Sequence, residues 1–387
     1  MKRDEIQKIA SSYDAGSVTI GVLGSHSAEE VGVAAKSFGL PTVVVCQRGR
    51  DSLYTRHNKH LYDEVIVLEK FSDIADDETQ ERLRELNTVF IPNRSFSVYA
   101  GYDRIEEDFR VPLYGNRDIL RAEERTEERS QYWLLEEAGI RFPRKFDSPE
   151  DIDRLAIVKV QQKHKPIERA FFFPSSPEEY RKKAEELIEK DIIAEEDLRR
   201  ARIEEYILGQ KFNANFQGWG LESLGDFDLV GFDDRKQTNL HGILGVPARD
   251  QLMLDVPVKN EEIGHYGLTM RESKKPLVYD AAERFRRVCE REYPPGMIGL
   301  FALQGAVGYD SEDPEGKKLS FYVFDVSPRI PGCPCVGPTS PEMRRLSLKF
   351  KSFLREFNLQ EVSTPMDLPM LEIRWAAAKG ELDKVVT

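Results

Sequence analysis

The segment Phe324-Asp325-Val326-Ser327-Pro328-Arg329 carries the most informative polar side chains in the chain. Asp325 and Ser327 are two residues apart at the end of an apolar strand pattern, so their side chains point to one face. Two oxygen ligands on one face suit Mg²⁺, which binds carboxylates together with phosphate oxygens. Arg329 could hold a phosphate through two parallel hydrogen bonds, and Gln304, in the neighbouring strand pattern, offers a further oxygen. An exposed strand with alternating polar residues is an equal alternative for this segment alone.

A lysine interrupts a second apolar strand pattern, Ala-Ile-Val-Lys-Val at 156–160. An ammonium group is costly to bury without a partner, so Lys159 either reaches a cleft that holds ATP phosphates or points outward to water. Glu204 and Glu205 begin another apolar run, which turns at Gly209. Strand alternation places only one of these two carboxylates on a given face. That one could meet ribose hydroxyls, and an exposed strand edge is the alternative.

Gly24-Ser25-His26-Ser27 lies between a strand pattern at 17–23 and a helical pattern that closes on a glycine. Small residues let a ligand approach the backbone, and a helix N-terminus favours an anion. A phosphate or nucleotide group could therefore bind there, with His26 as an additional donor. An ordinary turn with a serine N-cap is the simpler alternative and is favoured for this motif alone.

The elements that would position these residues form three regions. The strand–loop–helix–strand order at 17–47, followed by strand patterns at 65–70 and 88–92, predicts a Rossmann-like α/β domain over residues 1–125. Residues 126–210 combine helical patterns at 129–139 and after Ser176 with strands at 156–160 and 170–174. Residues 211–387 form the third region. We expect 202–209 and 211–216 to be a strand pair, 299–308 and 319–329 to be antiparallel strands, and the last ~45 residues to be mostly helical.

Composition narrows the class of protein. The 387 residues carry a net charge of −12, which argues against a nucleic-acid partner because phosphate-backbone binding needs a basic excess. No apolar run approaches the ~18 residues of a membrane span, and the charged N-terminus lacks a signal-peptide core, so we expect a cytoplasmic protein without a membrane partner. Cys333 and Cys335 have no second Cys or His pair nearby, which makes a zinc site improbable.

Several motifs, in order, resemble the ATP-grasp superfamily: Lys159, Glu-Glu-Tyr-x-x-Gly at 204–209, and Asp-x-Ser-Pro-Arg-x-x-Gly at 325–332. More narrowly, the chain resembles the archaeal formate-dependent ligases that make FAICAR (5-formamidoimidazole-4-carboxamide ribotide) from AICAR, formate and ATP. The stretches that carry this resemblance span nearly the whole chain: GSHS at 24–27, GRD at 49–51, KFSDI at 70–74, VPLYGNRDILRAEE at 111–124, SPEDID at 148–153, IEEYILG at 203–209, VPARDQL at 246–252 and PPGMIGLFALQ at 294–304.

The resemblance implies a pre-ATP-grasp domain followed by an ATP-grasp domain pair, a homo-oligomer, and a two-step reaction. Formate would attack the γ-phosphate of ATP to give formyl phosphate, and the AICAR amine would then attack the formyl carbon and release phosphate. The residues implied are His26, Ser95 and Asn239 for AICAR, Lys159, Glu204 and Glu205 for ATP, Gln304 and Asp325 for Mg²⁺, and Arg329 for catalysis.

The chain departs from the family pattern around these ligands. Residues 161–169 contain no glycine where the family has a glycine-rich loop, and the usual metal-strand Glu and Asn are Asp325 and Ser327. A His-Gly pair beside Ser95 is Asn93-Arg94, and the turn after Arg329 reads PGCPCVGPTSP. Two functions therefore stay open. One is a ligase acting on formate and AICAR, or on an altered acid and nucleotide. The other is a divergent nucleotide-binding paralogue that acts as a regulator or partner subunit.

Overall fold

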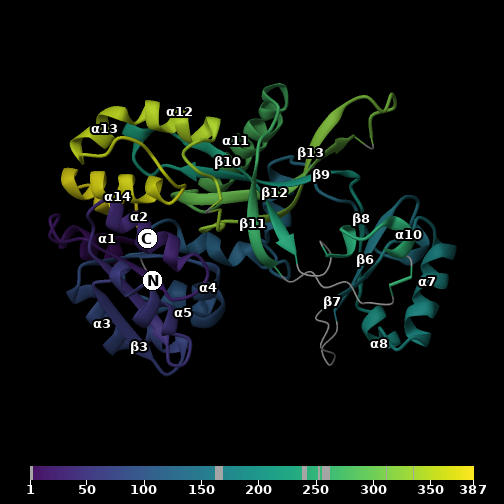
Figure 1. Ribbon diagram of the computed structural model, residues 1–387, viewed down its shortest axis with the longest axis horizontal. Coiled ribbons are helices and arrows are strands. Elements are labelled where there is room, and N and C mark those ends of the chain that lie inside the picture. Colours follow the sequence, from purple (N-terminus) through teal and green to yellow (C-terminus); the bar gives the residue numbers. More distant parts are fainter. Residues whose placement is uncertain are drawn as a thin grey trace.

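The computed structural model describes residues 3–161, 169–237, 242–251, 253–254, 262–310, 312–333 and 335–387. Within these residues, three β-sheets follow one another along the chain, each accompanied by helices (Figure 1). One sheet is parallel and two are antiparallel, which confirms the expected combination of α/β and α+β architecture. The domain boundaries at 125 and 210 stay predictions, and the second falls inside a strand of the third sheet.

The first sheet is parallel, with strand order β3-β2-β1-β4. Its strands β1 and β4 are buried along their whole length, as expected for a parallel sheet covered by helices on both faces. Because β1 and β4 are parallel neighbours, the loops that follow them emerge at the same edge. The strands are β1 (Thr19–Leu23), β2 (Thr42–Gln47), β3 (Glu64–Leu68) and β4 (Thr88–Ile91), and the helices are α1 (Arg3–Ser11), α2 (Ala28–Ser37), α3 (Asp77–Glu85), α4 (Arg94–Ala100) and α5 (Tyr102–Glu107), with short turns η1 (Leu53–His57), η2 (Lys59–Leu61), η3 (Phe71–Ala75) and η4 (Arg117–Glu123).

The second sheet is antiparallel, with strand order β5-β8-β6-β7. It forms the small domain at the right of Figure 1, where α7 and α8 accompany the strands. Its apolar core is separate from the other cores. The elements are α6 (Gln131–Glu137), which precedes the sheet, then β5 (Lys145–Phe146), η5 (Pro149–Asp151), β6 (Ala156–Gln161), β7 (Arg169–Phe172), α7 (Pro177–Glu189), α8 (Glu195–Leu198) and β8 (Arg202–Glu205).

The third sheet is also antiparallel, with strand order β11-β10-β9-β12-β13. The expectation that 299–308 and 319–329 pair as antiparallel strands is confirmed by β12 and β13. The strands are β9 (Gly209–Gly218), β10 (Phe227–Gln237), β11 (Glu262–Leu268), β12 (Gly299–Tyr309) and β13 (Leu319–Ser327), and the helices are α10 (Ala248–Gln251), α11 (Lys275–Glu292), α12 (Pro341–Lys349), α13 (Lys351–Glu356) and α14 (Asp367–Lys379), with turns η6 (Glu222–Leu224), η7 (Glu272–Lys274) and η8 (Leu382–Lys384).

Helices pack against the third sheet in two groups, α11 in one and the C-terminal helices in the other. Helix α11 buries Val278, Ala282 and Phe285, a three- and four-residue spacing that gives the helix one apolar face. Helix α14 lies beside the first domain, with α12 and α13 above it at the top of Figure 1, and residues of β1, α2 and α14 share one apolar cluster. The C-terminal helices therefore join the first and third sheets into one packed body. No helix in the described part of the chain is long and apolar enough to cross a membrane.

The expected pairing of 202–209 with 211–216 is wrong. Strand β8 ends at Glu205 and pairs with β5 and β6, whereas β9 begins at Gly209 and pairs with β10 and β12. A Cβ atom at Gly209 would lie 2.5 Å from the backbone oxygen of Val307, so β12 packs against this point too closely for a side chain. Residues 206–208 carry the chain between the two sheets, which places Glu204 and Glu205 just before the crossing.

Candidate active site

Asn93 fixes the loop that carries His26. Its side-chain amide nitrogen donates to the backbone oxygens of Leu23 at 3.0 Å and His26 at 2.9 Å, and its amide oxygen accepts from the N–H of Phe96 at 2.9 Å. Asn93 is fully buried, so these bonds tie the end of β1 to the start of α4. The residue that departs from the family pattern is thus a structural anchor for this loop.

The structure brings His26 and Ser95 to one place. The Ser95 hydroxyl donates to Ser25 Oγ at 2.8 Å, and Ser27 Oγ lies 3.0 Å from His26 Nδ1. Ser27 occupies the N-cap position of α2 but makes no side-chain cap, and its backbone is left-handed with φ 65°. The ordinary serine N-cap alternative is therefore wrong here. A left-handed non-glycine residue costs ~1–2 kcal/mol, and such strained positions concentrate at functional sites.

A pocket of about 620 Å³ opens beside this loop. Its size is within the range of small-molecule sites. Gly332 closes one side with φ +70°, and a Cβ atom there would lie 2.6 Å from His26 Cε1, so only glycine fits against the imidazole. Most of the remaining lining residues are polar, although most of the exposed lining surface is apolar: Ser25, His26, Ser27, Glu29, Glu30, His265 and Thr364, with Ala28, Val33, Leu53 and Tyr54.

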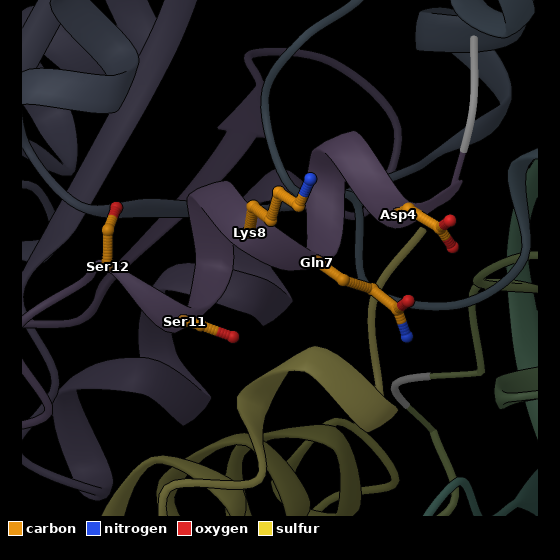
Figure 2. A pocket seen from close by; sticks show the side chains of 5 residues that line it. All are labelled: Asp4, Gln7, Lys8, Ser11 and Ser12. Atoms are coloured by element: carbon orange, nitrogen blue, oxygen red, sulfur yellow. The ribbon is translucent and has the colours of Figure 1, made fainter.

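A second hollow of about 500 Å³ follows α1 and is lined by Asp4, Gln7, Lys8, Ser11 and Ser12 (Figure 2). These side chains come from a single helix and include no convergent set of donors. The Gln7 amide already has a hydrogen-bond partner within the chain, because it donates to the backbone oxygen of Asp383 at 3.0 Å. We therefore assign no site to this hollow.

The two predicted metal ligands face each other across neighbouring strands. Gln304 of β12 is in register with Asp325 of β13, and the register shifts immediately afterwards at Gly305. This bulge needs glycine, because a Cβ atom at Gly305 would lie 2.0 Å from the backbone oxygen of Tyr322. Gln304 also donates to Ser327 Oγ at 2.9 Å. Bulges beside active sites redirect side chains, and here one lies next to the Gln304–Asp325 pair.

An arginine side chain contacts each of the two predicted metal ligands, Gln304 and Asp325. Arg235 donates to Gln304 Oε1 at 2.9 Å, and Arg125 Nη2 lies 3.3 Å from Asp325 Oδ1. Among the described residues, no group of three or more His, Cys, Asp or Glu side chains could hold a metal ion. One carboxylate with one amide oxygen nevertheless fits Mg²⁺ that arrives with nucleotide phosphates, since Mg²⁺ in such sites takes few protein ligands and keeps several waters.

Lys159 points into the molecule rather than outward. Its Nζ forms an ion pair with Glu204, which also pairs with Arg202. Burial lowers the pKa of Lys159, and the Glu204 carboxylate opposes that shift. Glu205 faces the other side of the strand, where it meets Arg154 at 3.4 Å. The expected alternation of the two carboxylates is therefore confirmed, and the outward-facing alternative for Lys159 is wrong.

The ring of Tyr132 connects the lysine group to the metal-ligand group. The guanidinium of Arg202 lies 4.5 Å from the ring centroid and that of Arg125 lies 5.9 Å away. The Tyr132 hydroxyl donates to the backbone oxygen of Phe324 at 3.2 Å, which fixes the ring beside β13. These cation–π contacts bring two guanidinium groups to one ring, and each guanidinium also pairs with a carboxylate, Arg202 with Glu204 and Arg125 with Asp325.

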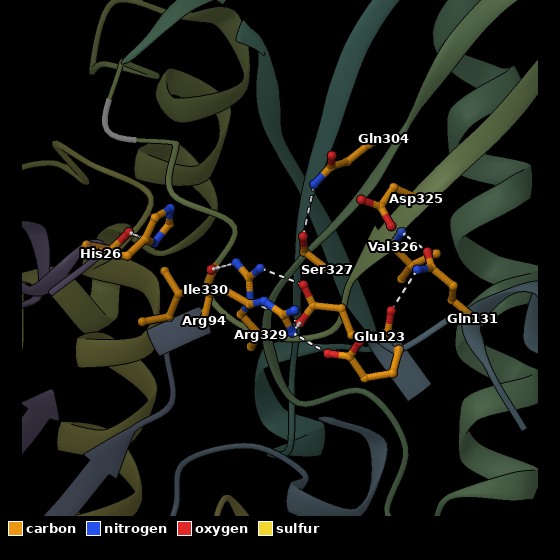
Figure 3. A network of polar contacts seen from close by, with 12 residues as sticks. His26, Arg94, Glu123, Gln131, Gln304, Asp325, Val326, Ser327, Arg329 and Ile330 are labelled. Atoms are coloured by element: carbon orange, nitrogen blue, oxygen red, sulfur yellow. Dashed lines mark hydrogen bonds and ion pairs between the residues drawn. The ribbon is translucent and has the colours of Figure 1, made fainter. Parts of the chain in front are cut away.

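Arg329 is buried and bound on two sides (Figure 3). Its Nη2 and Nε donate to Glu123 at 2.6 and 3.3 Å, and its Nη1 donates to the backbone oxygen of Ile330 at 2.6 Å. Glu123 also lies 3.5 Å from Arg94. A guanidinium has five N–H donors, so these bonds leave two for a ligand. Three residues after Arg329, the chain reaches Gly332 in the pocket beside His26.

Two expected features lie outside the described residues: the AICAR contact at Asn239 and most of the glycine-free segment, residues 162–168. Other residues of the site were not anticipated. These are Arg125, Arg202, Arg235, Glu123 and Tyr132, which come from three separate regions of the chain. Most of them stand in runs of mixed charge that resemble a solvated surface, so no local motif distinguishes them.

Two family models match the chain. Residues 20–146 match a protein of unknown function, DUF1246, and residues 179–387 match a domain of unknown function, DUF1297. The second model alone covers more than half of the chain.

Relatives and solved structures extend the comparison. The chain is 40% identical over the full length of both proteins to the 5-formaminoimidazole-4-carboxamide-1-(beta)-D-ribofuranosyl 5'-monophosphate synthetase of Methanopyrus kandleri. It is also 40% identical to the synthetase of the same name from Methanothermobacter thermautotrophicus, over 79% of this chain and 82% of that protein.

Two solved structures share the fold. The IMP biosynthesis protein PurP from Thermococcus kodakaraensis is 22% identical, with a TM-score of 0.65 over 95% of this chain and 100% of that one. An ADP complex of purK, N5-carboxyaminoimidazole ribonucleotide synthetase, is 12% identical, with a TM-score of 0.51 over 81% of this chain and 70% of that one. The chain therefore belongs to the family of 5-formaminoimidazole-4-carboxamide-1-(beta)-D-ribofuranosyl 5'-monophosphate synthetases and has their ATP-grasp fold.

Proposed function

We propose that this chain is an ATP-dependent ligase of IMP biosynthesis that formylates the amine of AICAR with formate to give FAICAR. The observation that carries the proposal is the continuity of two sites. A cluster of arginine and lysine side chains, here called the cationic cluster, includes Arg329, and the next three residues lead to the pocket beside His26 and Ser95. A phosphorylated intermediate formed at the first site would have only a short path to an amine bound at the second.

The cationic cluster has the charge that a polyphosphate needs, although the whole chain is acidic. Its cationic side chains outnumber its carboxylates. The cations are Lys159, Arg202, Arg125, Arg235, Arg329 and Arg94, and the carboxylates are Glu204, Asp325, Glu123 and Glu124. Fixed charges of this kind stabilise phosphoryl transfer without reorganising during the reaction.

In the proposed reaction, a formate oxygen attacks the γ-phosphorus of ATP and ADP leaves, which gives formyl phosphate. The AICAR amine then attacks the formyl carbon, the carbon–oxygen bond to phosphate breaks, and the amine loses a proton. Lys159 and Arg329 would hold the phosphates, and His26 and Ser95 would hold the ribotide close to the formyl carbon. Gln304 and Asp325 would hold Mg²⁺, which when bound neutralises phosphate charge.

The first test is turnover. Purified protein with ATP, Mg²⁺, formate and AICAR should release phosphate and form FAICAR in equal amounts. Asp325→Ala should lower that rate by ~10²-fold or more, because it removes the carboxylate proposed for the metal. Asp226→Ala is the matched control, since Asp226 also pairs with an arginine, at 3.5 Å, but does not belong to the cationic cluster. Wild type that forms no FAICAR would refute the proposed reaction.

Gly332→Ala should weaken AICAR binding. The new methyl group would lie 2.6 Å from His26 Cε1 and 3.1 Å from Ser27 Oγ, so the imidazole must move. We expect the KM for AICAR to rise by ~10-fold or more, since misplaced contacts are costly. Gly380→Ala controls for backbone strain, because Gly380 has φ +68° but open space around it. If both variants keep the wild-type KM, the pocket beside His26 does not bind the ribotide.

A nucleotide-binding paralogue without turnover is the second candidate. The observation that favours it is the pairing of Asp325 Oδ1 with Arg125 and of Gln304 Oε1 with Arg235, because each arginine competes with Mg²⁺ for that side chain. Binding of ATP and AICAR by calorimetry, with no product from any assay mixture, would support this candidate over the ligase. A homo-oligomeric state is a further prediction that the same purified protein would test.

A further inference from the structure

Arg94 contacts its partners in the chain through one nitrogen. Its Nη1 donates to the Tyr102 hydroxyl at 3.0 Å and to Glu124 Oε1 at 2.9 Å, and it lies 3.5 Å from Glu123 Oε2. The Tyr102 hydroxyl donates to the same Glu124 oxygen at 2.9 Å. These contacts fix the end of a long side chain, of which the proposed reaction so far uses only the charge.

The other edge of the Arg94 guanidinium is available to a ligand. Its Nε and Nη2 form no hydrogen bond within the part of the chain that the structure describes. Neither nitrogen is among the buried polar atoms that lack a partner, so both are accessible, in a side chain that is 35% exposed. Together Nε and Nη2 present two parallel N–H donors, which is the geometry that binds both oxygens of one carboxylate.

Arg94 connects the two proposed binding sites. Glu123 joins it to Arg329, because both arginines contact that carboxylate, at 3.5 and 2.6 Å (Figure 3). The residue after Arg94 is Ser95, which bonds to Ser25 in the lining of the pocket proposed for the ribotide. The acid substrate must meet the γ-phosphate at the first site and the amine at the second, so its carboxylate belongs at this junction.

The local charge suits a monoanion. Arg94 and Arg329 carry two positive charges, which the carboxylates of Glu123 and Glu124 balance. A bound carboxylate adds one negative charge and accepts two hydrogen bonds. A phosphate dianion would bring twice that charge beside the same two glutamates, and like charges at such short range repel. The junction therefore favours a small carboxylate over the phosphate of the ribotide.

We propose that the Nε–Nη2 edge of Arg94 binds the carboxylate of the acid substrate, which is formate in the proposed reaction, and orients it toward the γ-phosphorus. Each formate oxygen accepts one N–H bond and keeps a lone pair, so one oxygen can form the bond to phosphorus while the bond from phosphorus to ADP breaks. Arg94 transfers no proton. Where the family pattern has glycine this chain has Arg94, so the contact is particular to this chain. The inference rests on the proposed function, because it takes the acid and ATP as substrates of one reaction.

The test compares the KM values of formate, ATP and AICAR in wild type and two variants. Arg94→Met should raise the KM of formate roughly 10- to 100-fold, as the loss of charged hydrogen bonds predicts. It should leave the KM of ATP and of AICAR within about 2-fold of wild type, with most of kcat kept at saturating formate. Arg94→Lys should recover little of the loss, because lysine keeps the charge but not the paired donors. An NMR titration with isotopically labelled formate, in the presence of Mg²⁺ and a non-hydrolysable ATP analogue, should show the same loss of affinity without turnover.

Arg104→Met is the matched control and should behave like wild type. Arg104 of α5 has a similarly exposed side chain, at 38%, and pairs with Asp76 at 2.7 Å. The melting temperature of each variant checks its fold. If Arg94→Met raises the KM of ATP or AICAR instead of formate, or changes none of the three, the inference is overturned while the proposed function stands.

The formate titration separates the two failures. Wild type that forms no FAICAR would remove the proposed function, and the titration would then judge the carboxylate site by itself. Weaker formate binding by Arg94→Met than by wild type would support the site, and equal binding by the two proteins would overturn it.

Discussion

Arg329→Met is expected to lower kcat for FAICAR formation by ~10²–10³-fold, the usual cost of removing a fixed charge from a reacting oxyanion. The guanidinium has two N–H donors left after its bonds to Glu123 and the Ile330 backbone, and it belongs to the cationic cluster. Methionine keeps an unbranched apolar stem but offers no donor. The measurement is steady-state turnover at saturating ATP, formate and AICAR, with the melting temperature recorded for each variant.

Two further variants separate catalysis from stability. Glu123→Gln removes the charge that holds Arg329 but keeps the guanidinium, so it should lose stability while it keeps most of the activity. Arg141→Met breaks more exposed ion pairs, with Asp310 at 3.0 Å and Glu312 at 2.8 Å, which do not belong to the cationic cluster. It should lower the melting temperature alone. A normal kcat in Arg329→Met would mean that Arg329 only holds Glu123 in place.

Glu372→Ala is expected to destabilise the folded chain by ~3–5 kcal/mol, the range for breaking a buried charged network. Glu372 is fully buried in α14 and accepts from the Tyr114 hydroxyl at 2.7 Å. It also accepts from the N–H groups of Gly220 at 2.7 Å and Leu221 at 3.0 Å, and from the Gln217 amide at 3.5 Å. Alanine would remove the acceptor of the Tyr114 hydroxyl and of the Gly220 and Leu221 N–H groups at the junction of the first and third sheets, whereas the Gln217 amide would keep its bonds to Tyr114 and Gly218.

Urea unfolding followed by circular dichroism measures this loss. Glu381→Ala serves as the control, because its carboxylate forms only a largely exposed ion pair with Lys384, worth ~0–1 kcal/mol. Glu372→Gln keeps one carbonyl acceptor and should cost less than alanine. An unfolding free energy for Glu372→Ala within ~0.5 kcal/mol of wild type would show that the donors find water or other partners instead.

Periodicity located the strands that carry the candidate site because each is a short apolar run with a polar interruption. Lys159, Gln304 and Asp325 all lie on the strands where those runs place them. The pairing of β8 and β9 was predicted wrongly for a physical reason. A glycine between two apolar runs is typical of a hairpin, but Gly209 is required by the backbone of Val307 on β12, a contact from far along the chain.

The partners of the site residues were not predictable from local patterns. Arg125 contacts Asp325, 200 positions later in the chain, and Arg235 contacts Gln304, 69 positions later. The charged segments around these two arginines contain no pattern that predicts either contact. The left-handed backbone of Ser27 could not be predicted from the sequence either, since serine at that position usually caps a helix. Its conformation follows from the hydroxyl turning to His26 rather than to the helix, which only the folded loop determines.

The burial of Glu30 and Glu372 also changes the acid–base balance of the whole chain. Burial raises their pKa values to about 8 and about 7, whereas the unfolded chain would release both protons near pH 4.5. Folding at neutral pH therefore takes up protons, and the folded chain is less negative than its formal charge of −12. Because the native state binds more protons than the unfolded state between about pH 4.5 and 8, these two groups make its stability fall as pH rises through that window.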